Sequence, residues 1–409
     1  MRKLGLLVLL CLAFSPWGSV TAQQHANHGG HKAAVVSAPP SVSTGQGPTV
    51  TFDASGRLWA AWVHGAHVYV NHSEDLGNTF SDPVRVNAKA EKVRYNGEAR
   101  AQVAVDSKGN VFVVWNQKLE KRFTGNVRFS RSVDGGKHFS EPVTINDNRD
   151  VIGHAFITMA LDTSDKLHFT WLDARDLVAA KKSGRPFQGT SLYYAYSDDH
   201  GVTISQNQLL AKHTCQCCRI AVSFDNQETP VALWRHIFDE TKGVISRDHA
   251  LIKIGENDAQ LKRVSFEKWP AESCPHHGPS LAIDNNNRYH MTWFNLDQDK
   301  PGLYYANSSD EAQTLSPAYL FADGDSQAQH PYLLSEQDNL YLVWKSFDGE
   351  NSAVQIKHSK DGGASWSEAR TIASTAGDSD HPSLVTHDGY TYLSWQRSDE
   401  GYLLQQVGG

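Results

Sequence analysis

The 409-residue sequence is poor in methionine and cysteine, with three and five of them, and no long segment of it shows helical periodicity. Its net charge of −7 at pH 7 gives no reason to expect nucleic acid or an anionic membrane as a partner. Beyond the N-terminus no apolar run is long enough for a membrane helix, so no integral membrane segment is expected. The chain is 40% hydrophobic and 20% charged, with 11 Trp and 31 Gly, which is a soluble composition rich in turn residues.

The N-terminal residues predict export. Arg2 and Lys3 precede the apolar run GLLVLLCLAF, and SPWGSVTA ends in small residues, which is typical of a secretory signal peptide over residues 1–22. Residues 23–34 cannot build a core and predict a disordered leader, which carries His25, His28 and His31. Imidazoles at this density bind copper, nickel or zinc, although a plain polar tail explains them equally well. We therefore expect an exported protein, periplasmic or secreted.

A repeat of about 50 residues dominates the rest of the chain. Each unit predicts a strand, a short polar turn and a β-branched or aromatic strand, as in AQVAVDSKGNVFVVW, and most units continue with a third and a fourth strand. Aspartate and tryptophan recur nine residues apart at Asp53/Trp62, Asp106/Trp115, Asp162/Trp171, Asp225/Trp234 and Asp284/Trp293, and Trp344 and Trp395 continue the series. The pattern predicts an all-β fold, a seven-bladed β-propeller with four-stranded antiparallel blades over residues 35–409. The last unit stops after three strands, and the N-terminal segment KAAVVSAP is the candidate for its fourth strand.

A second motif marks the turn between the third and fourth strands. It reads SEDLGNTF (73–80), SVDGGKHF (132–139), SDDHGVTI (197–204) and SKDGGASW (359–366), with a weaker copy, SSDEAQTL (308–315). We expect the Asp to accept hydrogen bonds from its own turn, the Gly to adopt a positive φ and the last apolar residue to fill the sheet edge. In this motif the chain resembles the Asp-box (BNR-repeat) propellers of the sialidase-like superfamily over essentially its whole mature length. A six-bladed propeller of the sialidase type is the alternative that this resemblance implies.

Alignment of the repeats predicts a cluster of Cys and His residues at the propeller axis. Eight residues before the repeat Asp, successive units carry Gly45, Glu98, His154, Cys217 and His276. The other Cys and His residues of the predicted cluster lie close to the corresponding position in their own units. Thiolates and imidazoles together favour copper, with zinc as a second possibility. The predicted metal ligands are Cys215, Cys217, Cys218, Cys274, His276, His277, His154, His330 and His381. Structural disulfides, with Cys215 bridged to Cys274 and Cys217 and Cys218 left as a vicinal pair, are an equally open interpretation in an oxidising compartment.

The resemblance also implies a sialidase alternative. Sialidases clamp the substrate carboxylate with three arginines and use a Tyr–Glu nucleophile pair and an Asp acid/base, but their F/Y-R-I-P motif is absent here. The candidate catalytic residues on the same face are Arg100, Arg219, Arg235, Arg247, Tyr95, Glu98 and Asp173.

Three hypotheses follow for the function. The first is a metal-handling protein or a copper-dependent enzyme. The second is an exo-sialidase or a related glycan-acting or glycan-binding protein, and the third is a protein-interaction propeller with structural disulfides. A metal ion or a glycan is the expected partner, and a monomer is the expected state.

Overall fold

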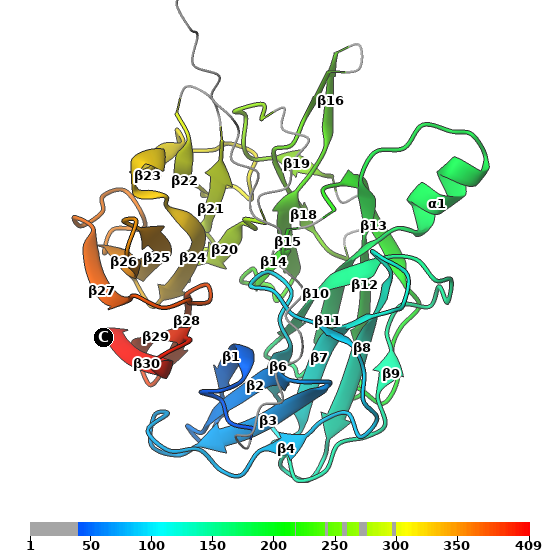
Figure 1. The fold of residues 1–409 in the computed structure, drawn as a ribbon. Helices are drawn as coiled ribbons and strands as arrows, with labels where there is room; N and C mark the ends of the chain where they lie inside the picture. Colours follow the sequence, from blue (N-terminus) through cyan, green and yellow to red (C-terminus); the bar gives the residue numbers. More distant parts are fainter. Residues whose placement is uncertain (1–39, 217, 242–243, 256–259, 270–275, 297–299) are drawn as a thin grey trace, which may run out of the picture. The chain divides into compact units, whose positions relative to one another are not determined.

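The computed structural model describes residues 40–409 except 217, 242–243, 256–259, 270–275 and 297–299. Within this part of the chain 30 strands make up almost all of the regular structure, together with helix α1 (Arg175–Lys182) and the 3-10 turn η1 (Gly324–Ser326). Among the described residues no helix is long and apolar enough to cross a membrane. The strands form antiparallel sheets, which are the blades of a β-propeller (Figure 1).

The first three blades take up the blue to green part of the chain in Figure 1. Blade one consists of β1 (Gln46–Phe52), β2 (Leu58–His64), β3 (His67–Ser73) and β4 (Val84–Arg85). Blade two consists of β6 (Gln102–Val105), β7 (Val111–Lys118), β8 (Gly125–Ser132) and β9 (Val143–Thr144), with β5 (Val93–Arg94) also paired to β7. Blade three consists of β10 (His154–Leu161), β11 (Leu167–Asp173), β12 (Thr190–Ser197) and β13 (Gln208–Thr214).

The remaining four blades complete the series. Blade four consists of β14 (Ala221–Phe224), β15 (Pro230–Arg235), β18 (His249–Lys253) and β19 (Lys262–Arg263), and a hairpin of β16 (Phe238–Thr241) and β17 (Val244–Ser246) is inserted in it. Blade five consists of β20 (Ser280–Ile283), β21 (Tyr289–Asn295), β22 (Gly302–Ser308) and β23 (Tyr319–Asp323). Blade six consists of β24 (Gln329–Glu336), β25 (Asn339–Phe347), β26 (Ser352–Ser359) and β27 (Arg370–Thr375). Blade seven consists of β28 (Ser383–His387), β29 (Tyr390–Arg397) and β30 (Gly401–Gly408).

The first strands of the blades form a closed ring around the axis. Contacts run from β1 to β6, β10, β14, β20, β24 and β28, and β28 contacts β1 again. The seven-bladed prediction is therefore confirmed, and the six-bladed alternative is wrong. The segment predicted to complete blade seven, residues 32–39, lies outside the described residues.

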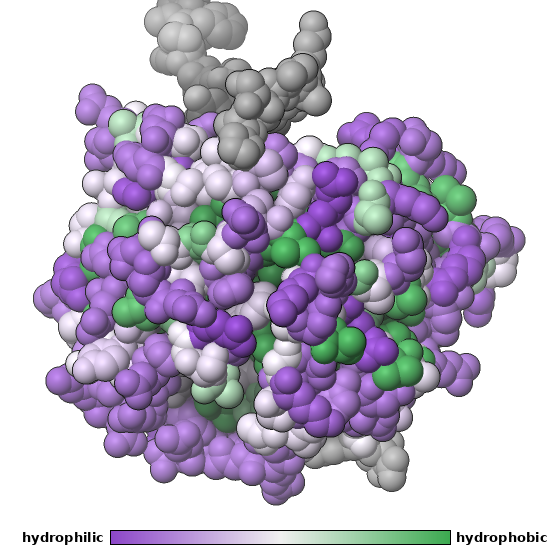
Figure 2. Space-filling view, turned by 90° about the horizontal axis from the view of Figure 1, so that it is seen from below, coloured by the Kyte–Doolittle hydropathy of each residue, from purple (hydrophilic) through white to green (hydrophobic). Residues whose placement is uncertain are grey.

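The core lies between the blades. The second strand of each blade is almost entirely buried, as in β2 with LWAAWVH, and its Trp packs against the neighbouring blade. Among the described residues the buried side chains form seven clusters, and every cluster contains residues of at least two consecutive blades. The last cluster joins Tyr402 of blade seven to Trp62 of blade one, so hydrophobic packing closes the ring. On the face shown in Figure 2 the surface is mainly hydrophilic, and apolar side chains lie in separate small groups.

The turns between third and fourth strands have the predicted hydrogen bonds. In blade six the Ser359 hydroxyl donates to Asp361, and Asp361 accepts the backbone N–H of Ser365 at 2.9 Å. The same bonds recur in the other four copies of the motif, around Asp75, Asp134, Asp199 and Asp310. Gly363 has a φ of +81°, and the weaker copy has Ala312 at +61° in the same place. The turn chemistry is confirmed, while the assignment to the Asp-box family remains a resemblance.

The Asp of the Asp/Trp repeat has a role that the sequence left unassigned. Its carboxylate accepts the backbone N–H groups two and four residues later, and so it fixes the turn between first and second strands. This pattern is present at Asp53, Asp106, Asp162, Asp225 and Asp284. The nine-residue spacing therefore joins an end-of-strand turn to a Trp in the core.

Candidate functional site

Glu98 is the centre of a polar network at the axis. Its side chain is 1% exposed and comes from the segment that leads into β6. Oε1 accepts a hydrogen bond from Arg219 Nη1 at 2.8 Å, and Oε2 accepts the backbone N–H groups of Arg219 at 3.1 Å and Gly278 at 2.9 Å. His330 Nδ1 lies 3.2 Å from Oε1, and His381 Nδ1 lies 3.4 Å from it. One carboxylate thus links blade two to blades four, five, six and seven.

The two arginines of this network are occupied by protein acceptors. Arg219 donates from Nε to the Pro279 carbonyl and from Nη2 to the Pro331 carbonyl, in addition to its bond with Glu98. Arg100 Nη2 donates to Asp380 at 2.9 Å and to the carbonyl of His381 at 2.8 Å. These two candidate catalytic arginines therefore link different blades at the axis.

The network contains an ionised carboxylate and neutral imidazoles. Burial by itself would raise the pKa of Glu98, but the Arg219 guanidinium and the contacts with His330 and His381 hold that pKa well below its ordinary value. Burial lowers the pKa of His381 to about 3 and takes the pKa of His330 well below its ordinary value. Burial, followed by the neighbouring His330, also lowers the pKa of His277. Near neutral pH these imidazoles carry lone pairs that can bind a cation.

A β-bulge places His330 at the axis. The pairing of β24 with β25 shifts register between Gln329 and Tyr332, and His330 has a φ of +54°. The equivalent shifts in β1 and β10 have Gly47 at +57° and Phe156 at +58°. Bulges redirect side chains in this way. His330 consequently meets His277, with the two Nδ1 atoms 3.2 Å apart, and its ring stacks on that of His381.

The described cysteines lie beside this network. Cys215 and Cys218 are buried, and no disulfide joins them to each other. A hydrogen bond with Cys215, followed by burial, raises the pKa of Cys218 well above its ordinary value. Neither sulfur belongs to the group of converging ligand atoms that contains Glu98. Cys217 and Cys274 lie outside the described residues, so their predicted bridges and metal ligation stay predictions.

His154 and Asp173 form a separate contact in blade three. His154 is fully buried, its Nδ1 bonds the Gly125 carbonyl at 2.9 Å, and its Nε2 lies 3.6 Å from Asp173. Asp173 also accepts hydrogen bonds from Trp171 and Arg175. This pair shares no residue with the group of Glu98, His330 and His381, although the repeat alignment had grouped His154 with them.

The other sequence candidates, Arg235, Arg247, Tyr95 and His276, lie in different environments. Arg235 is 2% exposed and stacks on Trp269 at 3.7 Å, with its Nε bonded to the carbonyl of Arg247. Arg247 Nη1 lies 4.0 Å from the sulfur of Cys215. Burial, followed by the charge of Asp380, raises the pKa of the Tyr95 phenol, which opposes a phenolate nucleophile there. His276 is exposed and has a φ of +59°.

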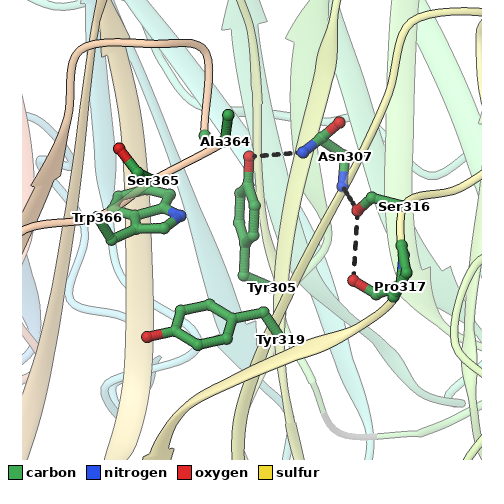
Figure 3. A pocket seen from close by; sticks show the side chains of 9 residues that line it. Tyr305, Asn307, Ser316, Pro317, Tyr319, Ala364, Ser365 and Trp366 are labelled. Atoms are coloured by element: carbon green, nitrogen blue, oxygen red, sulfur yellow. Dashed lines mark hydrogen bonds between the residues drawn. The ribbon is translucent and has the colours of Figure 1, made fainter.

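Two of the cavities in the described part of the chain bear on function. The first, of about 320 Å³, follows the axis between the innermost strands, and Glu98, Arg100, Arg219 and His381 are among its lining residues. The second, of about 360 Å³, lies between blades five and six and is shown in Figure 3. It was missed by the sequence reasoning, which placed the chemistry at the strand-1 end of the blades. Its only sequence signal is the Trp at the end of SKDGGASW.

The second cavity is aromatic and uncharged. Tyr305, Tyr319 and Trp366 lie around it, and the rings of Tyr305 and Trp366 meet edge to face with centroids 5.0 Å apart (Figure 3). The Asn307 amide donates to the Tyr305 hydroxyl at 3.2 Å, and the Asn307 backbone N–H donates to Ser316. Tyr319 is 42% exposed, whereas Tyr305 is buried. We call this cavity the aromatic pocket; its other lining residues are Pro317, Gly363, Ala364 and Ser365.

Comparisons with known proteins identify solved structures with a similar fold, but they identify no family for this chain. No protein-family model matches the sequence, and no curated protein matches it. The polysaccharide lyase Uly1 has a TM-score of 0.55 at 11% identity, covering 95% of each chain. The α-L-arabinanase of Penicillium chrysogenum, solved with arabinobiose, has a TM-score of 0.50 at 13% identity, covering 80% of this chain and 96% of that one. The Hadza microbial sialidase Hz136 has a TM-score of 0.49 at 13% identity, covering 84% and 74%. At these identities the likeness to Uly1 and to the arabinanase shows a shared fold and nothing further.

Proposed function

We propose that this protein is a glycan-binding β-propeller and that the aromatic pocket holds a saccharide ring. The observation that carries the proposal is the lining of the pocket, with three aromatic rings, one amide and two serines. A saccharide ring has apolar C–H faces, which pack on aromatic rings, and hydroxyls around its edge, which need polar partners. The lining residues include no charged side chain, so the proposed ligand is a neutral saccharide.

The comparisons support a glycan as ligand at the level of the fold. Uly1 is a polysaccharide lyase, and the Penicillium enzyme is an arabinanase solved with arabinobiose. A fold hosts many functions, so the lining of the pocket supports a saccharide ligand more directly than the shared fold does. We also propose an extracytoplasmic location, which rests on the N-terminal sequence alone.

The proposal is for binding and leaves out sialidase-type hydrolysis. A carboxylate clamp needs guanidinium N–H groups that are available to the substrate. Arg100 and Arg219 direct theirs to Asp380, Glu98 and backbone carbonyls, so a clamp would have to break buried ion pairs. The aromatic pocket makes no such demand.

The experiment is a screen of the purified protein against neutral and acidic oligosaccharides, followed by calorimetry on those that bind. Tyr319→Ala should weaken binding at least tenfold, because Tyr319 is the most exposed ring of the pocket. Tyr390→Ala is the matched control, since Tyr390 is 43% exposed on β29 and lies outside the pocket. Binding that survives Tyr319→Ala, or the absence of any bound saccharide, would contradict the proposal.

A further inference from the structure

Three potential metal ligands from three blades converge at the axis. Glu98 comes from blade two, His330 from blade six and His381 from blade seven, and one ligand atom of each lies within 4.8 Å of the others. We infer that these three side chains bind a divalent transition metal ion. This site is independent of the aromatic pocket and goes beyond glycan binding.

The separations between the ligand atoms fit a shared ion. Ligand atoms about 2.0–2.1 Å from one tetrahedral metal ion lie roughly 3.3–3.4 Å from each other. Glu98 Oε1 is 3.2 Å from His330 Nδ1 and 3.4 Å from His381 Nδ1. A charge-assisted N–H···O bond would bring these atoms to about 2.7–2.9 Å. These two distances are compatible with a shared ion, and the convergence of all three ligand atoms within 4.8 Å carries the inference.

The protons available cannot satisfy every contact of His330. Its Nδ1 lies 3.2 Å from both Glu98 Oε1 and His277 Nδ1. A ring nitrogen offers either one N–H or one lone pair. If His330 Nδ1 is protonated and donates to the Glu98 carboxylate, it has no lone pair left to accept a hydrogen bond from His277. If Nδ1 instead keeps its lone pair for His277, that lone pair faces an anionic oxygen. A metal ion resolves the contact with Glu98, because it accepts the lone pair of His330 and neutralises the carboxylate.

His381 adds a second observation of the same kind. Its Nδ1 is buried and has no hydrogen-bond partner among the described residues. His154 Nε2 and His249 Nε2 also lack a hydrogen-bond partner among the described residues, so the observation at His381 supports a ligand only together with the convergence of the three ligand atoms. The unpaired atom faces Glu98, on the side where the ion would lie.

The ligand chemistry selects the class of metal. Two imidazole nitrogens and one carboxylate oxygen suit borderline divalent ions such as Cu²⁺ and Zn²⁺, and Cu²⁺ binds most tightly in the general affinity order. The described cysteines lie outside the group, so the thiolate contribution predicted from the sequence is not part of this site. Arg219 donates to the same oxygen of Glu98, which a carboxylate permits because each oxygen has two lone pairs.

The test is calorimetric titration of the metal-stripped protein with Cu²⁺ and with Zn²⁺. The full mature chain should carry His25→Ala, His28→Ala and His31→Ala, so that the N-terminal histidines do not bind the ions. We expect one ion per chain, with affinity reduced at least 100-fold by His381→Gln and by His330→Gln. His154→Gln, which changes another buried histidine outside the group, should leave the affinity unchanged.

Electron paramagnetic resonance of the Cu²⁺-loaded protein keeps the test decisive if a variant fails to fold. In the folded protein that carries only the three N-terminal His→Ala substitutions, the spectrum should show coupling of Cu²⁺ to two imidazole nitrogens. Absence of stoichiometric binding, unchanged affinity in the folded His381→Gln protein, or a spectrum without imidazole coupling would each overturn the inference. Saccharide binding through Tyr319 would be unaffected by any of these results.

Discussion

Replacement of Glu98 by Ala should destabilise the propeller more than any substitution of a surface charge. The substitution leaves the backbone N–H groups of Arg219 and Gly278 without their acceptor, and an unpaired buried donor costs about 1–3 kcal/mol. It also leaves the Arg219 guanidinium, whose side chain is 20% exposed, without its counter-charge. Breaking a buried ion pair from one side costs about 3–5 kcal/mol. Because these contributions overlap, we expect a total loss of about 3–5 kcal/mol.

The assay is urea unfolding followed by tryptophan fluorescence, with thermal unfolding as a second measurement. An unfolding entropy of about 2.1 cal/mol/K per residue converts the loss into a fall in Tm of roughly 4–6 °C for a unit of this size. Glu120→Ala is the control, since Glu120 and its partner Lys92 are 86% and 63% exposed and such pairs contribute at most about 1 kcal/mol. A Glu98→Ala protein within about 1 kcal/mol of the parent would refute the reasoning that this network holds the blades together.

Two further predictions concern the turns between third and fourth strands. Gly136→Ala should cost more stability than Gly135→Ala: both glycines have a positive φ, but only at Gly136 would the new Cβ meet Trp59, at 2.6 Å. Equal urea midpoints for the two variants would contradict this. Hydrogen bonds from the Ser365 side chain and backbone lower the pKa of Asp361 from 3.8 to about 2. Because the folded pKa lies below the unfolded one, this carboxylate stabilises the fold above about pH 4, and the contribution is lost as the pH falls towards 2. Asp361→Asn should therefore flatten the pH dependence of the urea midpoint in that range, with exposed Asp82→Asn as the control.

The two proposed sites can be separated by their variants. Tyr319→Ala should alter saccharide binding and leave metal affinity unchanged, whereas His381→Gln should do the reverse. Loss of both activities in either variant would point to unfolding or to a coupling between the axis and blade five. Circular dichroism of each variant distinguishes these cases.

The repeat in the sequence was sufficient to predict the architecture. The Asp of each Asp/Trp pair fixes a turn through its own backbone, and the Trp nine residues later lies in the core, so both effects are local and recur with the period. The turns around Asp75 and Asp361 were predictable for the same reason, since all of their hydrogen bonds lie within five residues. The number of blades then follows from the number of repeats.

The site required the tertiary structure. Sequence alignment placed Glu98, His330 and His381 near one ring, and the structure brings these three together, but it turns His154 towards Asp173 and keeps the described cysteines apart from the group. The same register shift occurs in β10 and β24, but the residue with the positive φ is Phe156 in the first strand and His330 in the second, so only His330 is a histidine at the bulge itself. The arginines were equally undecided, because only the folded ring shows that Arg100 meets Asp380, 280 residues away. The aromatic pocket combines residues of blades five and six that have no common motif. Local hydrogen bonding and periodicity thus determined the fold from the sequence, whereas contacts between blades decided which side chains meet.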